Sequence, residues 1–179
     1  QQVVGGHGCV REWGMEQLVR DTRITQIYEG ANGIQALDLV GRKIASNGGR
    51  NMAVLIQEMR DFAAAADGEI SEFTQPLLDA VTELETLTAS VLSAAGDDPH
   101  AIGAASVEYL HIAGLTIYAY MWARMAKVAV AADQNEAFYA GKLHTARFFM
   151  QRLLPQVKSL AASVRAGSGV LMDIPVDAF

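Results

Sequence analysis

Residues 74–95, TQPLLDAVTELETLTASVLSAA, carry the pattern that decides the fold class. Apolar residues recur three or four positions apart along the whole stretch, which is the period of an α-helix with one buried face. This stripe consists of Leu77, Val81, Leu84, Leu87, Val91 and Ala95. Pro76 is predicted to lie in the first turn, where its missing N–H has no intrahelical partner to lose. A helix of this kind needs other helices to cover its stripe, so the sequence predicts a bundle.

The segments on both sides of this stretch also have helical signals. Asn51 is expected to cap the preceding helix, which ends at residues 67–68. Asp98 is expected to be the N-cap and Pro99 the first residue of a long helix that runs to about Ala132. Short polar or glycine-containing connections between successive helices are typical of an antiparallel, up-and-down arrangement.

A last helix is predicted after the long one. Asp133 and Glu136 have the spacing of a capping box, and Pro155 is expected to kink the helix that follows. Residues 167–169, Gly-Ser-Gly, close that helix, and the apolar tail 170–179 is expected to be extended and to pack against the bundle or a partner subunit. No β-sheet pattern or internal repeat is present, so an all-α helical bundle is expected.

Composition restricts the class of protein further. The chain has 179 residues, 51% of them hydrophobic, which is enough for one sizeable core. Its net charge of −6 and pI near 5.1 make a nucleic-acid partner unexpected. The longest stretch without Asp, Glu, Lys or Arg within the most hydrophobic part covers residues 109–123, short of the roughly 20 residues that a membrane span needs. We therefore expect a buried core helix there and no membrane span.

Cysteine and histidine usage points to no metal centre. Cys9 is the single cysteine, which excludes an intrachain disulfide and favours a reducing, cytoplasmic compartment, and a buried apolar role is expected for it. The N-terminus lacks the features of a signal peptide. The four histidines have no metal-ligand spacing, and His111 is expected to be a hydrogen-bonded core residue. The large side chains at positions 118, 121, 122 and 125 (Tyr, Met, Trp, Met) are expected to lie in the core or at a subunit interface.

The N-terminal quarter of the chain is organised differently. Residues 1–8, QQVVGGHG, form a Gly-rich segment whose backbone N–H groups could face an anion. An amphipathic helix follows it. Residues 20–35, RDTRITQIYEGANGIQ, then place Glu29 beside Gly30 at a break between two helical patterns. A second helical pattern runs to Ile44 and ends at residues 46–49, so a domain boundary is expected there, between residues 1–46 and residues 51–179.

These segments closely resemble the C-terminal domain of flavin-dependent acyl-CoA dehydrogenases, whose pattern is Q-x-x-G-G-x-G-aromatic, then R-D, I-Y-E-G-T and I-Q. The matching residues are Gln2, Gly5, Gly6, Gly8, Arg20, Asp21, Ile27, Tyr28, Glu29, Gly30, Ile34 and Gln35. The remaining helices are similar, in composition and order, to the C-terminal helical extension of the larger members of this family.

The resemblance implies a catalytic role for Glu29 as the base that removes the α-proton of an acyl-CoA thioester. It places Gly30 and Tyr28 beside the substrate. It also implies contacts to FAD from Gln2, Gly5 and Gly6, in that family made to the flavin of the neighbouring subunit. Two further flavin contacts are implied at positions 31 and 33, where Ala31 and Gly33 replace side chains that relatives carry, so contact there would be through the backbone. Cys9 likewise stands where relatives usually have an aromatic residue.

The resemblance also implies the partners: FAD, an acyl-CoA substrate, an electron-transfer flavoprotein and further copies of the chain in a homo-oligomer. The substrate class covers fatty acyl-CoA and methylthio-substituted propionyl-CoA. Nothing in the chain looks like a complete flavin-binding domain, so it is expected to be the C-terminal piece of a larger enzyme and to be inactive by itself. As an alternative, residues 51–179 are a non-catalytic assembly module that makes subunit contacts or covers the substrate channel.

Overall fold

The computed structural model describes residues 2–26, 32–66, 68–132 and 136–178, and every regular element in these ranges is helical. The all-α fold class predicted from the sequence is confirmed. By compactness the chain divides into residues 1–35 and residues 36–179, which we call the N-terminal unit and the bundle unit. The domain boundary expected between residues 46 and 51 was placed where a helical pattern ends, and it stays a prediction.

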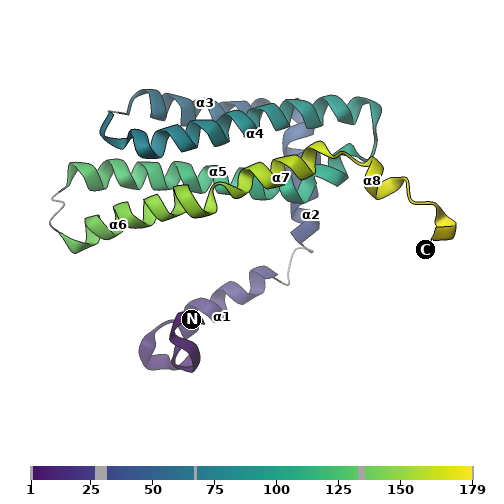
Figure 1. Cartoon of the computed structure of the whole chain (residues 1–179). Coiled ribbons are helices and arrows are strands. Elements are labelled where there is room, and N and C mark those ends of the chain that lie inside the picture. Colours follow the sequence, from purple (N-terminus) through teal and green to yellow (C-terminus); the bar gives the residue numbers. More distant parts are fainter. Residues whose placement is uncertain (1, 27–31, 67, 133–135, 179) are drawn as a thin grey trace. The chain divides into compact units, whose positions relative to one another are not determined.

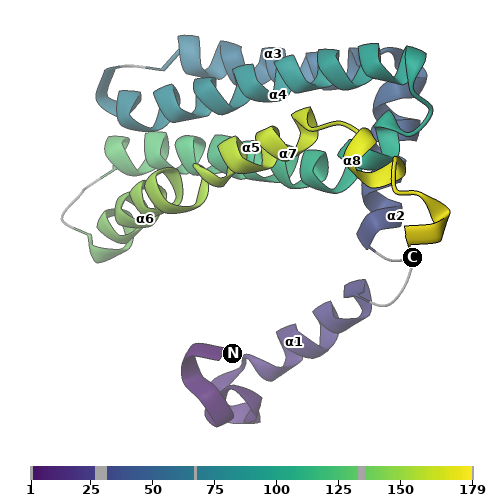
Figure 2. The same ribbon diagram turned by 45° about the vertical axis from the view of Figure 1, so that its right-hand side comes forward.

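Four long helical rods form the bundle unit (Figures 1 and 2). They are α3 (Arg50–Ala64), α4 (Ser71–Asp97), α5 (Ala101–Ala131) and a last rod made of α6 (Ala137–Phe148), the π-helical η7 (Phe149–Leu153) and α7 (Gln156–Arg165). Each rod packs on the one before it, and α7 also contacts α4. The predicted up-and-down order is therefore the observed one, and residues 109–123 lie in α5 with its buried face in the core.

The apolar stripe of α4 is buried as predicted. Leu77, Val81, Leu84 and Leu87 are fully buried and Val91 nearly so, whereas Ala95, at the end of the stripe, is only partly buried. The other helices complete one continuous core around this stripe. Large, fully buried members of this core outside the stripe include Met59 from α3, Phe73 from α4, and Tyr109 and Ile112 from α5.

The start of α4 differs from the prediction. The helix begins at Ser71, so Pro76 lies in its second turn instead of its first. Pro76 has no N–H to donate to the carbonyl of Glu72, which normally disfavours a helix at this point. Ile70 and Phe73 are buried beside the stripe, and this burial explains why the helix extends N-terminal of the proline.

The start of α3 also differs. Gly49 (φ +80°) is the N-cap, and Arg50 is the first helical residue. Asn51 is not the cap. Its backbone N–H donates to the side-chain oxygen of Asn47 at 3.4 Å, so Asn47 caps the helix from the preceding turn. Gly48 and Gly49 both have positive φ and reverse the chain there, which brings Asn47 to the helix end.

The next two helix starts also differ from the prediction. The α5 helix begins at Ala101 with His100 at its N-cap, so Asp98 is not the N-cap and Pro99 is not the first helical residue. Asp98 Oδ1 accepts the N–H of His100 at 2.8 Å and so caps the turn that precedes the helix. Glu136 stands at the N-cap of α6 and makes no capping bond with its side chain. The predicted capping box needed Glu136 inside the helix, and that prediction is wrong. Its other member, Asp133, lies outside the described residues.

The last rod breaks where Pro155 was expected to kink it. The chain passes from α6 through η7, and Pro155 is the N-cap of α7. The tail, however, is not extended, because it contains α8 (Gly169–Met172) and the 3₁₀ turn η8 (Val176–Ala178). The carbonyl of Ser168 accepts the N–H of Leu171 at 2.9 Å, so local hydrogen bonds decide the conformation of the tail.

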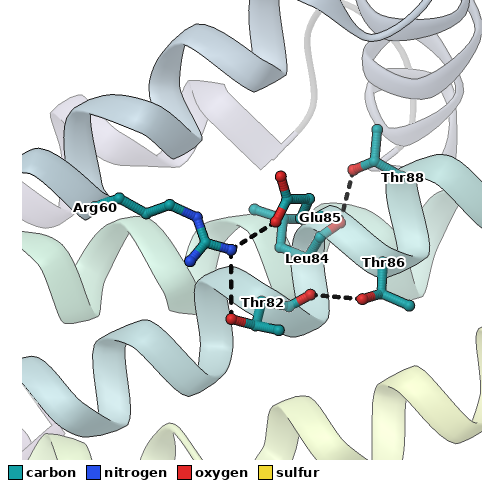
Figure 3. Close-up of polar contacts among 6 residues, drawn as sticks. All are labelled: Arg60, Thr82, Leu84, Glu85, Thr86 and Thr88. Carbon is teal, nitrogen blue, oxygen red and sulfur yellow. Dashed lines mark hydrogen bonds and ion pairs between the residues drawn. The ribbon is translucent and has the colours of Figure 1, made fainter.

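Polar side chains connect neighbouring rods. Arg60 of α3 donates to Glu85 Oε2 at 2.5 Å and to Thr82 Oγ1 at 3.4 Å, both on α4 (Figure 3). The hydroxyl of Thr88 donates to the carbonyl of Leu84 at 2.7 Å and lies 2.5 Å from the buried hydroxyl of Tyr109 on α5. Since the Thr88 proton is already used, Tyr109 is the donor to Thr88, and burial raises the pKa of its phenol.

A carboxylate–guanidinium pair joins α4 to α6 and predicts a pH dependence of stability. Arg147 Nε and Nη2 donate to Glu72 at 2.8–3.1 Å, and these hydrogen bonds lower the pKa of Glu72 below its ordinary value of 4.5. A lowered folded-state pKa means that the pair stabilises the fold above the unfolded-state pKa. This contribution is lost as the pH falls through the lower, folded-state value. Both side chains are 40% exposed or more, so solvent screening keeps the effect small.

Replacing Glu72 by Gln should therefore reduce the loss of unfolding free energy as the pH falls below the ordinary carboxyl pKa of 4.5, and variant and parent should converge once the carboxylate is protonated in both states. Urea unfolding at a series of pH values measures this slope. Glu69→Gln, an exposed carboxylate three residues away, is the matched control. Parallel pH profiles for the Glu72 variant and the parent would contradict the assigned role of the pair.

Candidate functional site

The N-terminal unit carries the Gly-rich segment and both flanks of the I-Y-E-G motif. Its elements are η1 (Gln2–Cys9), η2 (Arg11–Trp13), α1 (Glu16–Arg23), η3 (Ile24–Gln26) and the start of α2 (Asn32–Leu37). Large apolar side chains of this unit are exposed, among them Val3, Trp13, Leu18, Ile24 and Ile34. The part of this unit that the structure describes therefore has no hydrophobic core of its own.

The candidate cofactor residues near the N-terminus share one short segment. Gln2, Gly5 and Gly6 all lie in η1. Gly5 has φ +55° and ψ −136°, a conformation that residues with a side chain rarely adopt. A Cβ added at Gly5 or Gly6 would meet nothing within 4 Å, so the space beside this backbone is open. Glycine at position 5 is thus explained by backbone conformation, and the open backbone leaves room for a ligand to approach.

The charged residues of the motif's first half are paired along α1. Arg20 Nε donates to Glu16 at 2.7 Å and its Nη2 donates to Gln17 at 2.6 Å. Gln17 in turn donates to Asp21 at 2.6 Å. The amphipathic helix expected after the Gly-rich segment corresponds to α1, and Arg20 and Asp21 form their hydrogen bonds within that helix.

The residues expected to carry the chemistry fall in a gap of the description. Tyr28, Glu29, Gly30 and Ala31 lie outside the described residues. Gly33 is described: it lies in α2, is exposed, and has open space where a Cβ would be. The described geometry therefore provides the helices before and after the motif, and the assignments to Glu29 and its neighbours remain proposals.

Cys9 and His111 were expected to be buried, and Tyr118 and Met121 were expected in the core or at a subunit interface. Cys9 is exposed, and so is His111, which precedes the fully buried Ile112. Tyr118 is 62% exposed and Met121 is 38% exposed, on the same side of α5. The opposite side of α5 faces the core and carries mostly alanines together with a few bulky residues such as Tyr109 and Ile112. His111 lies on the exposed side, so it is not a core residue.

The structure adds features that the sequence reasoning did not include. Residues 38–44 form a π-helical turn, η4 (Asp38–Ile44), and η7 is a second one. A cavity of about 200 Å³ lies between α4 and the η7–α7 break, lined in part by Pro76, Met150 and Pro155. The two prolines were visible in the sequence as sites where helices cannot pack regularly, and they were the available signal for this cavity.

Metal-binding clusters and membrane-spanning helices are both absent from the described ranges. In residues 2–26, 32–66, 68–132 and 136–178, no group of three or more His, Cys, Asp or Glu side chains is arranged to hold a metal ion. None of the helices in these ranges combines the length and the apolar composition needed to cross a lipid bilayer.

The fold and the sequence motifs together define an all-α C-terminal domain, and comparisons with known proteins identify its family. The family described as "Acetyl-CoA dehydrogenase C-terminal like" matches residues 55–175, and the one described as "Acyl-CoA dehydrogenase, C-terminal domain" matches residues 1–45. The chain therefore belongs to the acyl-CoA dehydrogenase family, as a C-terminal part.

Curated relatives match nearly the whole chain. It is 30% identical to the broad-specificity linear acyl-CoA dehydrogenase FadE5 of Mycobacterium tuberculosis over 99% of this chain and 31% of that protein. It is 33% identical to the 3-methylmercaptopropionyl-CoA dehydrogenase of Ruegeria pomeroyi over 86% of this chain and 27% of that protein. A butyryl-CoA dehydrogenase of Syntrophomonas wolfei is 26% identical over 99% of this chain and 30% of that protein. The chain thus spans less than a third of the length of these relatives.

Proposed function

We propose that the complete protein is an FAD-dependent acyl-CoA dehydrogenase that introduces a double bond between Cα and Cβ of an acyl-CoA thioester. The observation that carries this proposal is the order of the two family matches along one chain, the first of which contains the I-Y-E-G sequence with Glu29. The names of the relatives support the reaction class, since each is an acyl-CoA dehydrogenase.

Glu29 is proposed as the base. A hydrogen on Cα of a thioester is weakly acidic, so a carboxylate must be held next to it and the thioester carbonyl must be polarised while the proton leaves. The Glu29 carboxylate takes the Cα proton, and its backbone N–H donates to the thioester oxygen. Gly30 leaves space for the thioester, and the ring of Tyr28 lines the pocket wall. When bound, FAD accepts the hydride that leaves Cβ.

The described residues fit a role in holding FAD. The proposed contacts to the adenosine diphosphate part come from Gln2, Gly5 and Gly6, and the open space at both glycines admits a pyrophosphate close to the backbone. Ala31 and Gly33 are proposed as backbone contacts nearer the flavin. Gly33 has the same open space, which supports its assignment.

We propose that this chain alone is inactive. It spans less than a third of its relatives, and the exposed apolar residues of its N-terminal unit are typical of a segment that completes its packing against another part of a protein. The complete protein is proposed to act in the cytoplasm as a homo-oligomer and to pass electrons to an electron-transfer flavoprotein.

Purification of the complete protein tests the proposed function. It should contain FAD by absorbance, lose the oxidised flavin spectrum on addition of acyl-CoA, and reduce an electron-transfer flavoprotein in the presence of substrate. Linear acyl-CoA and 3-methylmercaptopropionyl-CoA are the substrates to compare, because relatives of both names match. A protein without flavin, or flavin that neither thioester reduces, would exclude the proposal.

A second candidate function is favoured by the apolar surface of the bundle: residues 51–179 act as an assembly module or cover the substrate channel. Exposed aromatic side chains such as Tyr118, Phe138 and Phe148 support it. Deleting residues 51–179 from the complete protein should then change oligomer size or thermal stability first. Unchanged size and stability after this deletion, with turnover lost, would reject the assembly role.

A further inference from the structure

The longest helix, α5, is apolar on two faces and covered on one. Its alanine-rich face packs against α4, α6 and α7. On the side away from this core lie six residues spaced alternately four and three positions apart, which we call the α5 seam. They are Val107, His111, Gly114, Tyr118, Met121 and Met125. Alternating steps of three and four residues are the heptad spacing with which one helix packs along another.

Most of the α5 seam is exposed in the bundle unit, although the Tyr118 ring lies edge-on to that of Phe149 in η7, with 6.4 Å between the ring centroids. Val107 is 41%, Met121 is 38% and Tyr118 is 62% exposed, and His111 is exposed too, whereas Gly114 and Met125 are partly buried. The residues that flank the seam are also apolar and only partly buried, namely Leu110, Leu115, Ile117 and Trp122. A helix that is hydrophobic all round normally has all of its faces covered. The seam is therefore expected to have a partner.

We propose that the partner is the α5 seam of a second copy of this chain, packed antiparallel around a two-fold axis at the level of Thr116. In this register Val107 lies opposite the partner's Met125, and His111 lies opposite the partner's Met121. Gly114 lies opposite the partner's Tyr118. The two residues of each pair lie equally far from position 116 along the helix, one before it and one after it. A single two-fold axis at that level therefore produces all three pairs of contacts between the two seams.

The sizes of the residues next to the axis fit this register. A Cβ added at Gly114 would meet nothing within 4 Å, so the space beside this glycine is open, and we call it the hollow of the seam. The most exposed large side chain of the seam, Tyr118, fills that hollow from the partner, and by symmetry this happens twice. A parallel pair would place glycine against glycine and tyrosine against tyrosine, which leaves a gap in one layer and crowding in the other.

The charges of α5 favour the same orientation. Its one acidic residue, Glu108, lies in the N-terminal half, and its basic residues Arg124 and Lys127 lie in the C-terminal half. The antiparallel register brings Glu108 to the level of the partner's Arg124, whereas a parallel pair brings like charges together. The seam therefore matches itself in size and charge, which favours a second copy of the chain as its partner. Packing against a different segment of the same subunit would not require the seam to be self-complementary.

Paired cysteines test the register in the complete protein, in a Cys9→Ser background. Val107→Cys with Met125→Cys should form a covalent dimer on mild oxidation, because each cysteine faces the other residue's copy. Within one helix the two positions are about 27 Å apart, far beyond the roughly 4–7 Å between Cα atoms that a disulfide spans. The single variants should stay uncrosslinked, because each cysteine lies about 27 Å from the same cysteine in the partner copy. No dimer from the double variant, or a dimer from either single variant, overturns the proposal.

A size change at the hollow gives an independent test. Gly114→Leu in the double-cysteine background should sharply lower the yield of covalent dimer, since the new side chain occupies the place of the partner's Tyr118. Leucine has a higher helix propensity than glycine, so the helix itself is not weakened. Gly141→Leu is the matched control, an exposed glycine inside α6 with the same open space and no place in the seam, and it should leave the yield unchanged. Equal yields for the two leucine variants contradict the register. Neither measurement depends on Glu29 or on bound FAD.

Discussion

Replacing Glu29 by Gln in the complete protein is expected to lower the turnover of acyl-CoA by about 10²–10⁴-fold or more, the range that loss of a positioned general base typically produces. Gln is nearly the same size as Glu but cannot take up the α-proton. Substrate and flavin contacts made by the backbone at this position should survive the change. The loss is therefore expected in kcat, with KM changed much less.

Three measurements on one preparation isolate this effect: the rate of electron-transfer flavoprotein reduction, the flavin content by absorbance, and the mass by light scattering. The first should fall while the other two match the parent. Glu12→Gln, an exposed carboxylate in the same N-terminal unit, is the control and should keep normal turnover. Near-normal turnover by the Glu29 variant would reject Glu29 as the base and leave the family assignment intact.

The part of the fold that sequence predicts best is the bundle around α4. The stripe from Leu77 to Val91 has one helical period and one buried face, so its burial follows from spacing alone. The errors lie at helix ends. Pro76 was placed in the first turn by a local preference, whereas burial of Ile70 and Phe73 moved the start of the helix back to Ser71. Tertiary packing outweighed the local signal there.

The α5 helix shows a different limit. Apolar residues occupy both of its faces, so periodicity cannot tell which face meets the core. His111 was expected in the core and Tyr118 in the core or at an interface, and the structure places both on the exposed face. The sequence shows which residues share that face of α5. Whether the face lies in the core or on the surface depends on which side of α5 the neighbouring helices pack against.

The candidate site was predicted from motif residues rather than from general patterns. A lone carboxylate next to glycine between two helices gives no reaction by itself; the resemblance supplied the role of Glu29. For the Gly-rich segment the structure adds a physical reason, since Gly5 has a backbone conformation that favours glycine. The proposed site also needs FAD and further protein, and no pattern within 179 residues specifies their geometry.

The largest effect on stability is expected from Phe73→Ala, which should lower the free energy of unfolding by about 3–5 kcal/mol. Phe73 is 1% exposed, and it lies in the first turn of α4, N-terminal of Pro76. The Arg147 guanidinium of α6 stands 5.9 Å from the centre of its ring. Truncation removes the buried ring and leaves a cavity where α4 meets α6. The turn that the proline already weakens loses its main packing contact.

Val54→Ala on α3 is the matched control, because it also shortens an apolar side chain in a helix, but Val54 is 71% exposed. Its free energy of unfolding should stay within about 0.5 kcal/mol of the parent. Urea unfolding followed by circular dichroism compares the two variants, and similar midpoints for both would contradict the burial of Phe73. Since Phe73 is no part of the proposed site, turnover per folded molecule of the complete protein should be unchanged by this truncation. Loss of stability by Phe73→Ala and loss of turnover by Glu29→Gln would then separate the structural role of the bundle from the chemical role of the motif.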